Sequence, residues 1–152
     1  MITRRKFVAS AAAGTALAAA APALAFEVDP KFRPQQVGIK NTLSAGQILI
    51  LPRAHFLYYV TAPGQAIRYG VGVGRAGLEF TGDAIIQVKK EWPTWRPTNE
   101  MIERDPKLEK YRDGQDGGPS NPIGARGLYL WQGNVDTLYR IHGTNQPRSI
   151  GT

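Results

Sequence analysis

Histidine is the residue of this chain best suited to acid–base chemistry, and the sequence holds only two, His55 and His142. His142 closes a run of strand-forming residues and is followed by Gly143, Thr144 and Asn145. An imidazole within hydrogen-bond reach of a thiol can take its proton and stabilise the thiolate that forms. The chain contains no cysteine, so a thiol partner is missing from the sequence. The alternative for His142 is a strand-end histidine that bonds a nearby carbonyl group.

Other common site patterns are missing from the sequence. It contains no phosphate-binding loop, no His-Glu-x-x-His zinc string and no Gly-x-Ser-x-Gly nucleophile turn. With two histidines in separate predicted strands, we expect no metal site and no cofactor. The glycine-rich run 70–74 lacks the following helix and the lysine of a phosphate-binding site. His55 matches no pattern and is expected to have a surface or packing role.

Aromatic and cationic side chains are the remaining candidates for substrate contacts. Trp92 and Trp95 can offer a flat platform for a sugar or a peptide stem, although covering a sheet edge is the more ordinary role. Arg126 and Arg140 can meet carboxylates, and Arg140 is favoured because it precedes the second histidine by two residues on the same strand face. A structural pair with Asp136 is an equally good interpretation.

A mainly β fold must position these residues. The chain has 17 Gly and 11 Pro, which break helices, and 3 Trp, 6 Tyr and 5 Phe, which favour strands. Apolar runs, some continuous and some alternating, predict strands over residues 47–51, 56–60, 66–73, 84–90, 126–131 and 138–142. The last two are joined by a polar connection and are expected to form a hairpin.

The strand predicted over residues 66–73 alternates apolar residues with arginine and glycine. This period of two predicts that Ile67, Tyr69, Val71 and Val73 face the core. The glycines on the opposite face either admit a close approach of another segment or mark a bulge, and the bulge is the favoured interpretation.

Two features of the connecting segments can be predicted. A short helix is expected to begin at Thr98 or Asn99, whose side chains can cap it, and to end by Asp105 and Pro106. The stretch 113–122 is rich in glycine and proline and is typical of an exposed, mobile surface loop.

Residues 1–25 have the features of a cleaved export signal. A basic start with Arg4, Arg5 and Lys6 precedes an alanine-rich apolar run and an Ala-Leu-Ala cleavage site at 23–25. Paired arginines before Phe7 favour the twin-arginine type over an ordinary secretory signal. The apolar run is too short and too weakly apolar for a spanning helix, so we expect no stable membrane insertion after cleavage. The mature protein is expected to be periplasmic or associated with the cell wall.

The mature chain is expected to be one domain with a mild positive charge. The formal net charge of +7 falls to +4 without residues 1–25. Such a surplus favours anionic polymers such as a bacterial wall without fixing a partner, and nucleic acid is not an expected partner outside the cell. Residues 26–45 are expected to be an irregular lead-in and residues 46–152 the domain itself. Without cysteine the domain has no disulfide, so core packing must stabilise it.

Four strings in the second part of the chain form a recognisable series. They are a Gly-x-Gly run with Phe80-Thr81-Gly82, then Lys90-Glu91-Trp92-Pro93-x-Trp95-x-Pro97-Thr98, then Gly117-Gly118-Pro119-x-Asn121-Pro122-Ile123-Gly124-Ala125-Arg126, and finally Tyr139-Arg140-Ile141-His142-Gly143-Thr144-Asn145-x-Pro147-x-Ser149-Ile150-Gly151. In this order they resemble the catalytic domain of YkuD-type L,D-transpeptidases over roughly residues 46–152.

The resemblance implies a curved β-sandwich with a short helix and a cysteine enzyme of bacterial peptidoglycan. In such enzymes a thiolate attacks the carbonyl of the diaminoacid at the third position of a tetrapeptide stem and expels the terminal D-Ala. An amine then resolves the acyl-enzyme. The resemblance implies that His142 is the base, that the carbonyl of Gly143 orients its ring and that Thr144 lines the acceptor side of the cleft.

In the family the nucleophile lies in a Ser-x-Gly-Cys segment shortly after the His-Gly-Thr string, and this sequence ends before it. The resemblance therefore implies a C-terminally incomplete domain with C-terminal strands missing, inactive as written. An L,D-carboxypeptidase, a noncatalytic peptidoglycan-binding relative and an unrelated secreted β-sandwich stay open as alternatives. The sequence indicates no oligomeric state.

Overall fold

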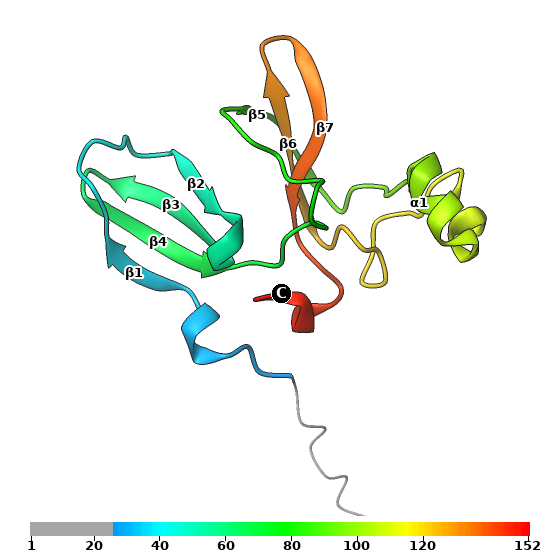
Figure 1. Cartoon of the computed structure of the whole chain (residues 1–152), viewed down its shortest axis with the longest axis horizontal. Coiled ribbons are helices and arrows are strands. Elements are labelled where there is room, and N and C mark those ends of the chain that lie inside the picture. Colours follow the sequence, from blue (N-terminus) through cyan, green and yellow to red (C-terminus); the bar gives the residue numbers. More distant parts are fainter. Residues whose placement is uncertain (1–25) are drawn as a thin grey trace, which may run out of the picture.

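The chain is mainly β, as predicted, with two antiparallel sheets and few helices (Figure 1). The computed structural model describes residues 26–152, and the predicted export signal over residues 1–25 lies outside these residues. Within the described part, no helix is both long enough and apolar enough to cross a membrane.

The elements follow the predicted order closely. One sheet has the strand order β1 (Gln35–Gly38), β4 (Gln65–Gly70), β3 (Phe56–Ala62), β2 (Ile48–Leu51). The other has the order β5 (Ile85–Glu91), β6 (Arg126–Gln132), β7 (Val135–His142). The helices are α1 (Asn99–Arg104) and four 3-10 turns, η1 (Pro30–Phe32), η2 (Pro52–Ala54), η3 (Pro106–Tyr111) and η4 (Pro147–Ser149).

The core of the first sheet is built on β3 and β4, which pair along their whole length. Val60 and Ala66 lie opposite each other and are the most buried apolar residues of the described chain. Ile67 and Tyr69, predicted to face the core, are only half-buried. The prediction was wrong here because a cluster led by Phe32 covers the other face of β4, where its ring lies 5.6 Å from that of Phe56.

The lead-in is more regular than predicted. Its residues 35–38 form β1, which pairs antiparallel with β4 at the edge of the first sheet. Three of its four residues, Gln35, Gln36 and Gly38, are exposed and only Val37 is half-buried. An edge strand of this kind is held by backbone hydrogen bonds, and its sequence therefore carries no apolar alternation.

The second sheet holds the predicted hairpin of β6 and β7, and β7 carries an irregularity. The register of the pair shifts between Tyr129 and Trp131, where Leu138 has φ of 61° and is 78% exposed. The strand alternation therefore does not run unbroken from Leu138 to His142. Beyond this bulge the pairing is regular again, and His142 lies opposite Gly127.

A long crossover over residues 71–84 leaves β4 and leads to β5, and its first residues run beside the C-terminal turn (Figure 1). The amide of Gly151 donates to the carbonyl of Val71 at 3.0 Å, and the amide of Val73 donates to that of Thr152 at 3.1 Å. Gly72 sits between these bonds, where a methyl group would lie 2.7 Å from the carbonyl oxygen of Ser149. The glycine therefore permits a close approach, and the predicted bulge is wrong.

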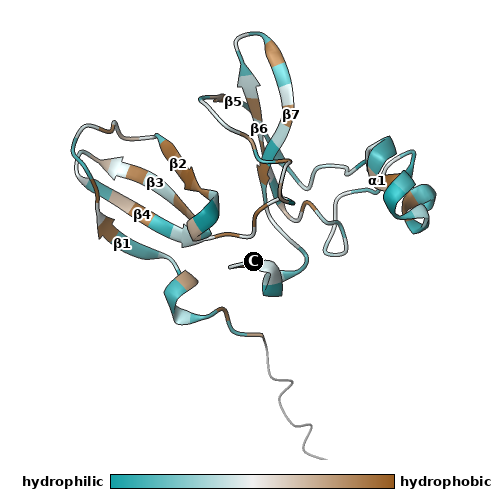
Figure 2. Ribbon diagram, in the orientation of Figure 1, coloured by the Kyte–Doolittle hydropathy of each residue, from teal (hydrophilic) through white to brown (hydrophobic). Residues whose placement is uncertain are grey.

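Hydropathy follows this arrangement, with β2 hydrophobic and the α1 region largely hydrophilic (Figure 2). The helix α1 begins as predicted, because the Thr98 hydroxyl accepts a hydrogen bond from the amide of Met101 at 3.3 Å. It ends before Asp105 and Pro106, and among its residues only Ile102 is buried.

We expect Gly72→Ala to destabilise the protein by about 1–3 kcal/mol, because the added methyl group forces the backbone at Ser149 away. The matched control is Gly74→Ala, where the nearest atom to the methyl group is the Leu78 carbonyl oxygen at 4.0 Å. That change should alter stability by less than about 1 kcal/mol. Urea unfolding followed by tryptophan fluorescence measures both, and equal midpoints for the two variants would contradict the close contact.

Candidate functional site

A cleft of about 560 Å³ lies where the end of β7 meets the crossover and the C-terminal turn. Four groups of residues line it: Ile50 and Leu57 of the first sheet, residues 70–74, the segment 141–144, and Ser149, Ile150 and Thr152. The floor is mostly apolar or backbone. His142 is its only lining residue with a titratable side chain, so acid–base chemistry in this cleft rests on that imidazole.

The ring of His142 is oriented by the backbone of the next residue. Its Nδ1 lies 2.6 Å from the carbonyl oxygen of Gly143. A carbonyl oxygen only accepts hydrogen bonds, so Nδ1 carries the proton in the neutral ring and Nε2 is left with a free lone pair. The side chain is exposed. This is the tautomer that can accept a proton at Nε2.

Gly143 and Thr144 are held by two kinds of contact. The amide of Gly143 donates to the carbonyl of Arg126 at 3.0 Å, which extends the β6–β7 pairing past His142. The hydroxyl of Thr144 accepts from the amide of Gln146 at 2.8 Å and so closes a local turn just before η4. The structure therefore brings together the three predicted residues of the His-Gly-Thr string in one cleft.

Arg140 is engaged elsewhere. Its guanidinium makes two hydrogen bonds to the Asp136 carboxylate, at 2.7 and 2.8 Å, and lies 4.0 Å from the centre of the Tyr129 ring. The hydrogen bonds from Arg140, the amide of Leu138 and the charge of Arg140 together lower the pKa of Asp136. Of the two interpretations left open by the sequence, the contact with Asp136 is the one that this geometry contains.

The two tryptophans and Arg126 lie outside the cleft lining. Trp92 follows β5, is 48% exposed and has φ of 43°, an uncommon value for a bulky side chain. Trp95 is half-buried, pairs through its backbone with Gln115 and packs its ring 5.9 Å from that of Tyr111. Arg126 forms an exposed ion pair with Glu91 at 3.1 Å.

The loop over residues 113–122 is anchored rather than wholly exposed as predicted. Asn121 is completely buried, and its side-chain amide lies within hydrogen-bond distance of four backbone groups. At Gly117 a methyl group would lie 2.0 Å from the carbonyl oxygen of Trp92. The prediction failed because a polar composition was taken to mean solvent exposure, whereas here the polar group bonds the loop's own backbone.

Sequence reasoning missed the cleft wall formed by residues 70–74 and by Ser149, Ile150 and Thr152. Gly70 and Gly72 carried a usable signal, because glycine on one face of a strand permits close backbone approach. The partner of that approach lies almost 80 positions away in the sequence and carries no local pattern.

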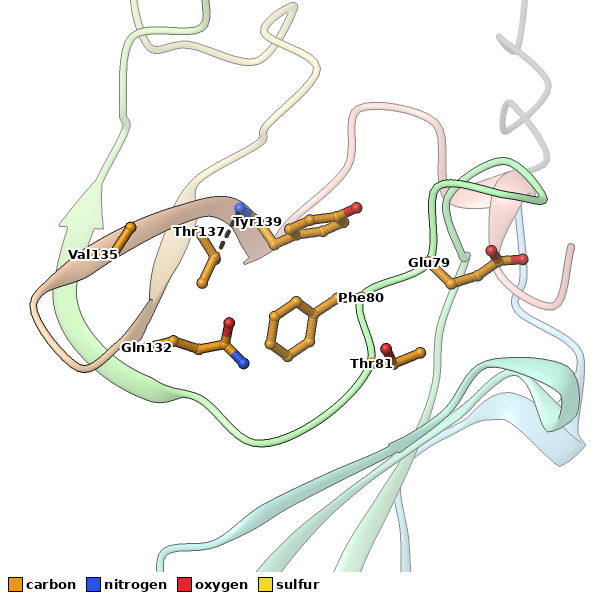
Figure 3. A pocket seen from close by; sticks show the side chains of 7 residues that line it. All are labelled: Glu79, Phe80, Thr81, Gln132, Val135, Thr137 and Tyr139. Carbon is orange, nitrogen blue, oxygen red and sulfur yellow. Dashed lines mark hydrogen bonds between the residues drawn. The ribbon is translucent and has the colours of Figure 1, made fainter.

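A second, shallower pocket lies beside β7, and Figure 3 shows its side chains. It is lined by Glu79, Phe80, Thr81, Gln132, Val135, Thr137 and Tyr139. The rings of Phe80 and Tyr139 lie 5.3 Å apart and join the crossover to the hairpin. His55 is half-buried between η2 and β3 and lines a different pocket, whose lining does not include His142. Across residues 26–152, no group of three or more His, Cys, Asp or Glu side chains could hold a metal ion.

The fold and the cleft define a mainly β domain with one backbone-oriented histidine in its cleft. Residues 45–152 match the family model described as YkuD, the L,D-transpeptidase catalytic domain. The chain therefore belongs to the YkuD family of L,D-transpeptidase catalytic domains.

Two curated relatives are named L,D-transpeptidases. The chain is 31% identical over 124 residues to the probable L,D-transpeptidase ErfK/SrfK of Escherichia coli strain K12. This match covers 78% of this chain and 37% of that protein. The chain is also 31% identical over 121 residues to the probable L,D-transpeptidase YbiS of the same strain, covering 78% of this chain and 38% of that protein. The chain thus spans a little over a third of the length of these relatives.

A solved structure is also similar. It is the crystal structure of a protein from Brucella melitensis named a probable carnitine operon oxidoreductase, with 54% sequence identity and a TM-score of 0.69. The match covers 82% of this chain and 78% of that chain.

The pair of Arg140 and Asp136 predicts a pH-dependent stability. Because the pKa of Asp136 is lowered in the folded state, the pair stabilises the protein above about pH 4, the ordinary range of an aspartate, and this stability is lost as the pH falls through the folded value. We expect Asp136→Asn to lower the urea midpoint at neutral pH, and the gap from the wild type to close in strong acid.

The control for this measurement is Glu103→Gln on α1, because the Glu103 carboxylate is exposed and forms no ion pair or side-chain hydrogen bond within residues 26–152. A gap between Asp136→Asn and the wild type that stays constant from neutral pH to strong acid would refute the contribution of the pair.

Proposed function

We propose that this chain is the histidine-bearing part of an exported peptidoglycan L,D-transpeptidase that works through a cysteine acyl-enzyme on tetrapeptide stems. The observation that carries the proposal is the 2.6 Å contact between Nδ1 of His142 and the carbonyl of Gly143 inside the cleft. Membership of the family supplies the reaction class.

The arrangement suits His142 to a defined pair of proton transfers. Nε2 takes the proton of a thiol, and the thiolate attacks the carbonyl carbon of the third stem residue. When the bond to the terminal D-Ala breaks, the imidazolium returns the proton to the departing amine. The acceptor amine then attacks the thioester and gives a proton to Nε2, the new amide forms and the thiolate leaves. The Gly143 carbonyl stabilises the imidazolium in both steps, because it accepts from Nδ1 throughout.

The thiol needed for these steps is not among the 152 residues, because the sequence contains no cysteine. We therefore propose that this chain binds a stem but does not cleave it. Among the predicted contacts, Thr144 lines the cleft and is proposed to meet the acceptor. Trp92, Trp95, Arg126 and Arg140 lie outside the cleft lining and are proposed at most to contact more distant parts of the wall polymer.

An oxidoreductase activity, named for the similar Brucella protein, finds less support in this fold. A dinucleotide-binding fingerprint needs a glycine-rich turn that enters a helix. Here the run from Gly70 to Gly74 leads from β4 into an extended segment that lies along the C-terminal turn. The glycines of this run thus serve a backbone contact.

Export remains part of the proposal. The basic start, the apolar run and the cleavage site within residues 1–25 support passage out of the cytoplasm by the twin-arginine route. The periplasm or the wall is where peptide stems are accessible.

The proposal is tested with purified disaccharide tetrapeptide added to the ¹⁵N-labelled 152-residue chain. We expect amide shifts that cluster at residues 70–74 and 141–144, no release of D-Ala and no covalent adduct with a carbapenem by mass spectrometry. The disaccharide without its stem is the matched control and should leave these amides unchanged.

Several results would overturn or redirect the proposal. Release of D-Ala would show that another group acts as the nucleophile, and shifts that avoid the cleft would reject stem binding there. The gene just beyond codon 152 separates the remaining alternatives. A reading frame that enters a Ser-x-Gly-Cys segment supports the enzyme, whereas a stop codon favours a noncatalytic peptidoglycan binder. With the thiol present, release of D-Ala without crosslinking would indicate an L,D-carboxypeptidase.

A further inference from the structure

We propose that Asn121 is a positioning residue for His142, acting through the backbone of residues 123–125 and Gly143. The proposal rests on the proposed function only where it takes His142 to be the proton acceptor. Its physical content is that the buried side-chain amide of Asn121, which is not part of the cleft lining, sets which ring nitrogen of His142 carries the proton.

Asn121 is the only polar residue of the described chain that is buried, with no exposed surface at all. Its amide nitrogen lies within hydrogen-bond distance of the carbonyl oxygens of Pro93, Gln115 and Asp116, at 3.2, 3.0 and 3.1 Å. Its oxygen accepts from the amide of Ile123 at 2.8 Å. A side chain that donates and accepts is needed at this point, and replacing it by an apolar group leaves buried backbone groups unpaired.

These bonds tie together segments that are distant in sequence. Pro93 follows β5, and Gln115 and Asp116 belong to the glycine-rich loop. Ile123 leads into β6, whose first residues pair with the end of β7. The side chain of Asn121 therefore fixes the path of the chain as it enters β6, beside the end of β7 that carries His142.

The next contact is between two backbones. Gly124 has φ of 69°, and a methyl group on it would lie 2.8 Å from the amide nitrogen of Thr144 and 2.9 Å from the carbonyl carbon of Gly143. On the other side, a methyl group on Gly143 would lie 3.2 Å from the carbonyl oxygen of Ile123. The peptide group between Gly143 and Thr144 is thus packed directly against residues 123–125.

That peptide group bears the carbonyl that holds Nδ1 of His142. A rotation of the peptide moves this oxygen away from the ring, and the neutral imidazole is then free to carry its proton at Nε2 instead. In that tautomer the free lone pair is on Nδ1, so Nε2 cannot accept a proton from the cleft. A second tether acts in the same direction, because the side-chain amide of Asn145 donates to the carbonyl of Ser120 at 2.8 Å.

The test reads the histidine tautomer directly and needs neither substrate nor activity. The 152-residue chain is labelled with ¹⁵N-histidine and studied by long-range proton–nitrogen spectra at a pH that keeps both imidazoles neutral. The chain has two histidines, so His55 is an internal reference. We expect His142 to show the Nδ1–H form alone in the wild type and to lose this single-tautomer signature in Asn121→Ala, with His55 unchanged.

Two further variants separate positioning from general destabilisation. Thr137→Val removes the hydroxyl that donates to Leu130 at 2.7 Å and accepts from Tyr139 at 3.2 Å, at the far end of β7, and should leave the tautomer of His142 intact. Gly124→Ala keeps Asn121 but pushes on the Gly143 peptide, and should disturb the tautomer. It decides the matter if Asn121→Ala does not fold.

The proposal is overturned if wild-type His142 is in the Nε2–H form, or if a folded Asn121→Ala keeps the Nδ1–H form. It is also overturned if Gly124→Ala leaves the tautomer unchanged or if Thr137→Val alters it equally. Failure of the chain to bind a tetrapeptide stem, with these tautomer results as expected, would reject the proposed function and leave the role of Asn121 standing.

Discussion

Contacts between backbones that only glycine permits determine the shape of the cleft. At Gly72 the crossover meets the C-terminal turn, and at Gly124 the entry to β6 meets the peptide group between Gly143 and Thr144. Both contacts bring backbone carbonyl and amide groups into van der Waals range, and a methyl group added to the glycine prevents the contact. Because the cleft wall is made of such backbone contacts, few polar side chains line the cleft, and His142 is the titratable one.

The described chain buries few apolar side chains. The buried apolar residues, Leu57, Val60, Ala66, Ile102 and Leu130, are spread over both sheets and α1. Hydrogen bonds between connecting segments therefore help to hold the two sheets and α1 together. The buried amide of Asn121 links β5, the glycine-rich loop and β6, whereas the Arg140 and Asp136 pair braces the bulged part of β7. These polar contacts are directional, so they suit the orientation of a single imidazole.

Local patterns in the sequence predicted most of the helices and strands, but contacts between residues distant in the sequence were not predicted. Thr98 and the Asp105–Pro106 pair marked both ends of α1, apolar alternation marked β5, and the polar connection after residue 131 marked the hairpin of β6 and β7. The strand β1 was missed because an edge strand needs no apolar face. The role of Asn121 was missed because its carbonyl partners are assembled only by the fold. The histidine and its two neighbours were predicted through a motif, and the opposing wall of the cleft, which has no motif, was not.

The end of β2 has a consequence for association with other chains. This apolar strand, Ile48–Leu51, lies at the outer edge of its sheet, with Ile50 and Leu51 exposed. Pro52 follows at once, lacks an amide proton and starts the turn η2, and Arg53 adds a charge. These two residues act as gatekeepers, because they limit the ladder that any added strand can form to the four residues of β2.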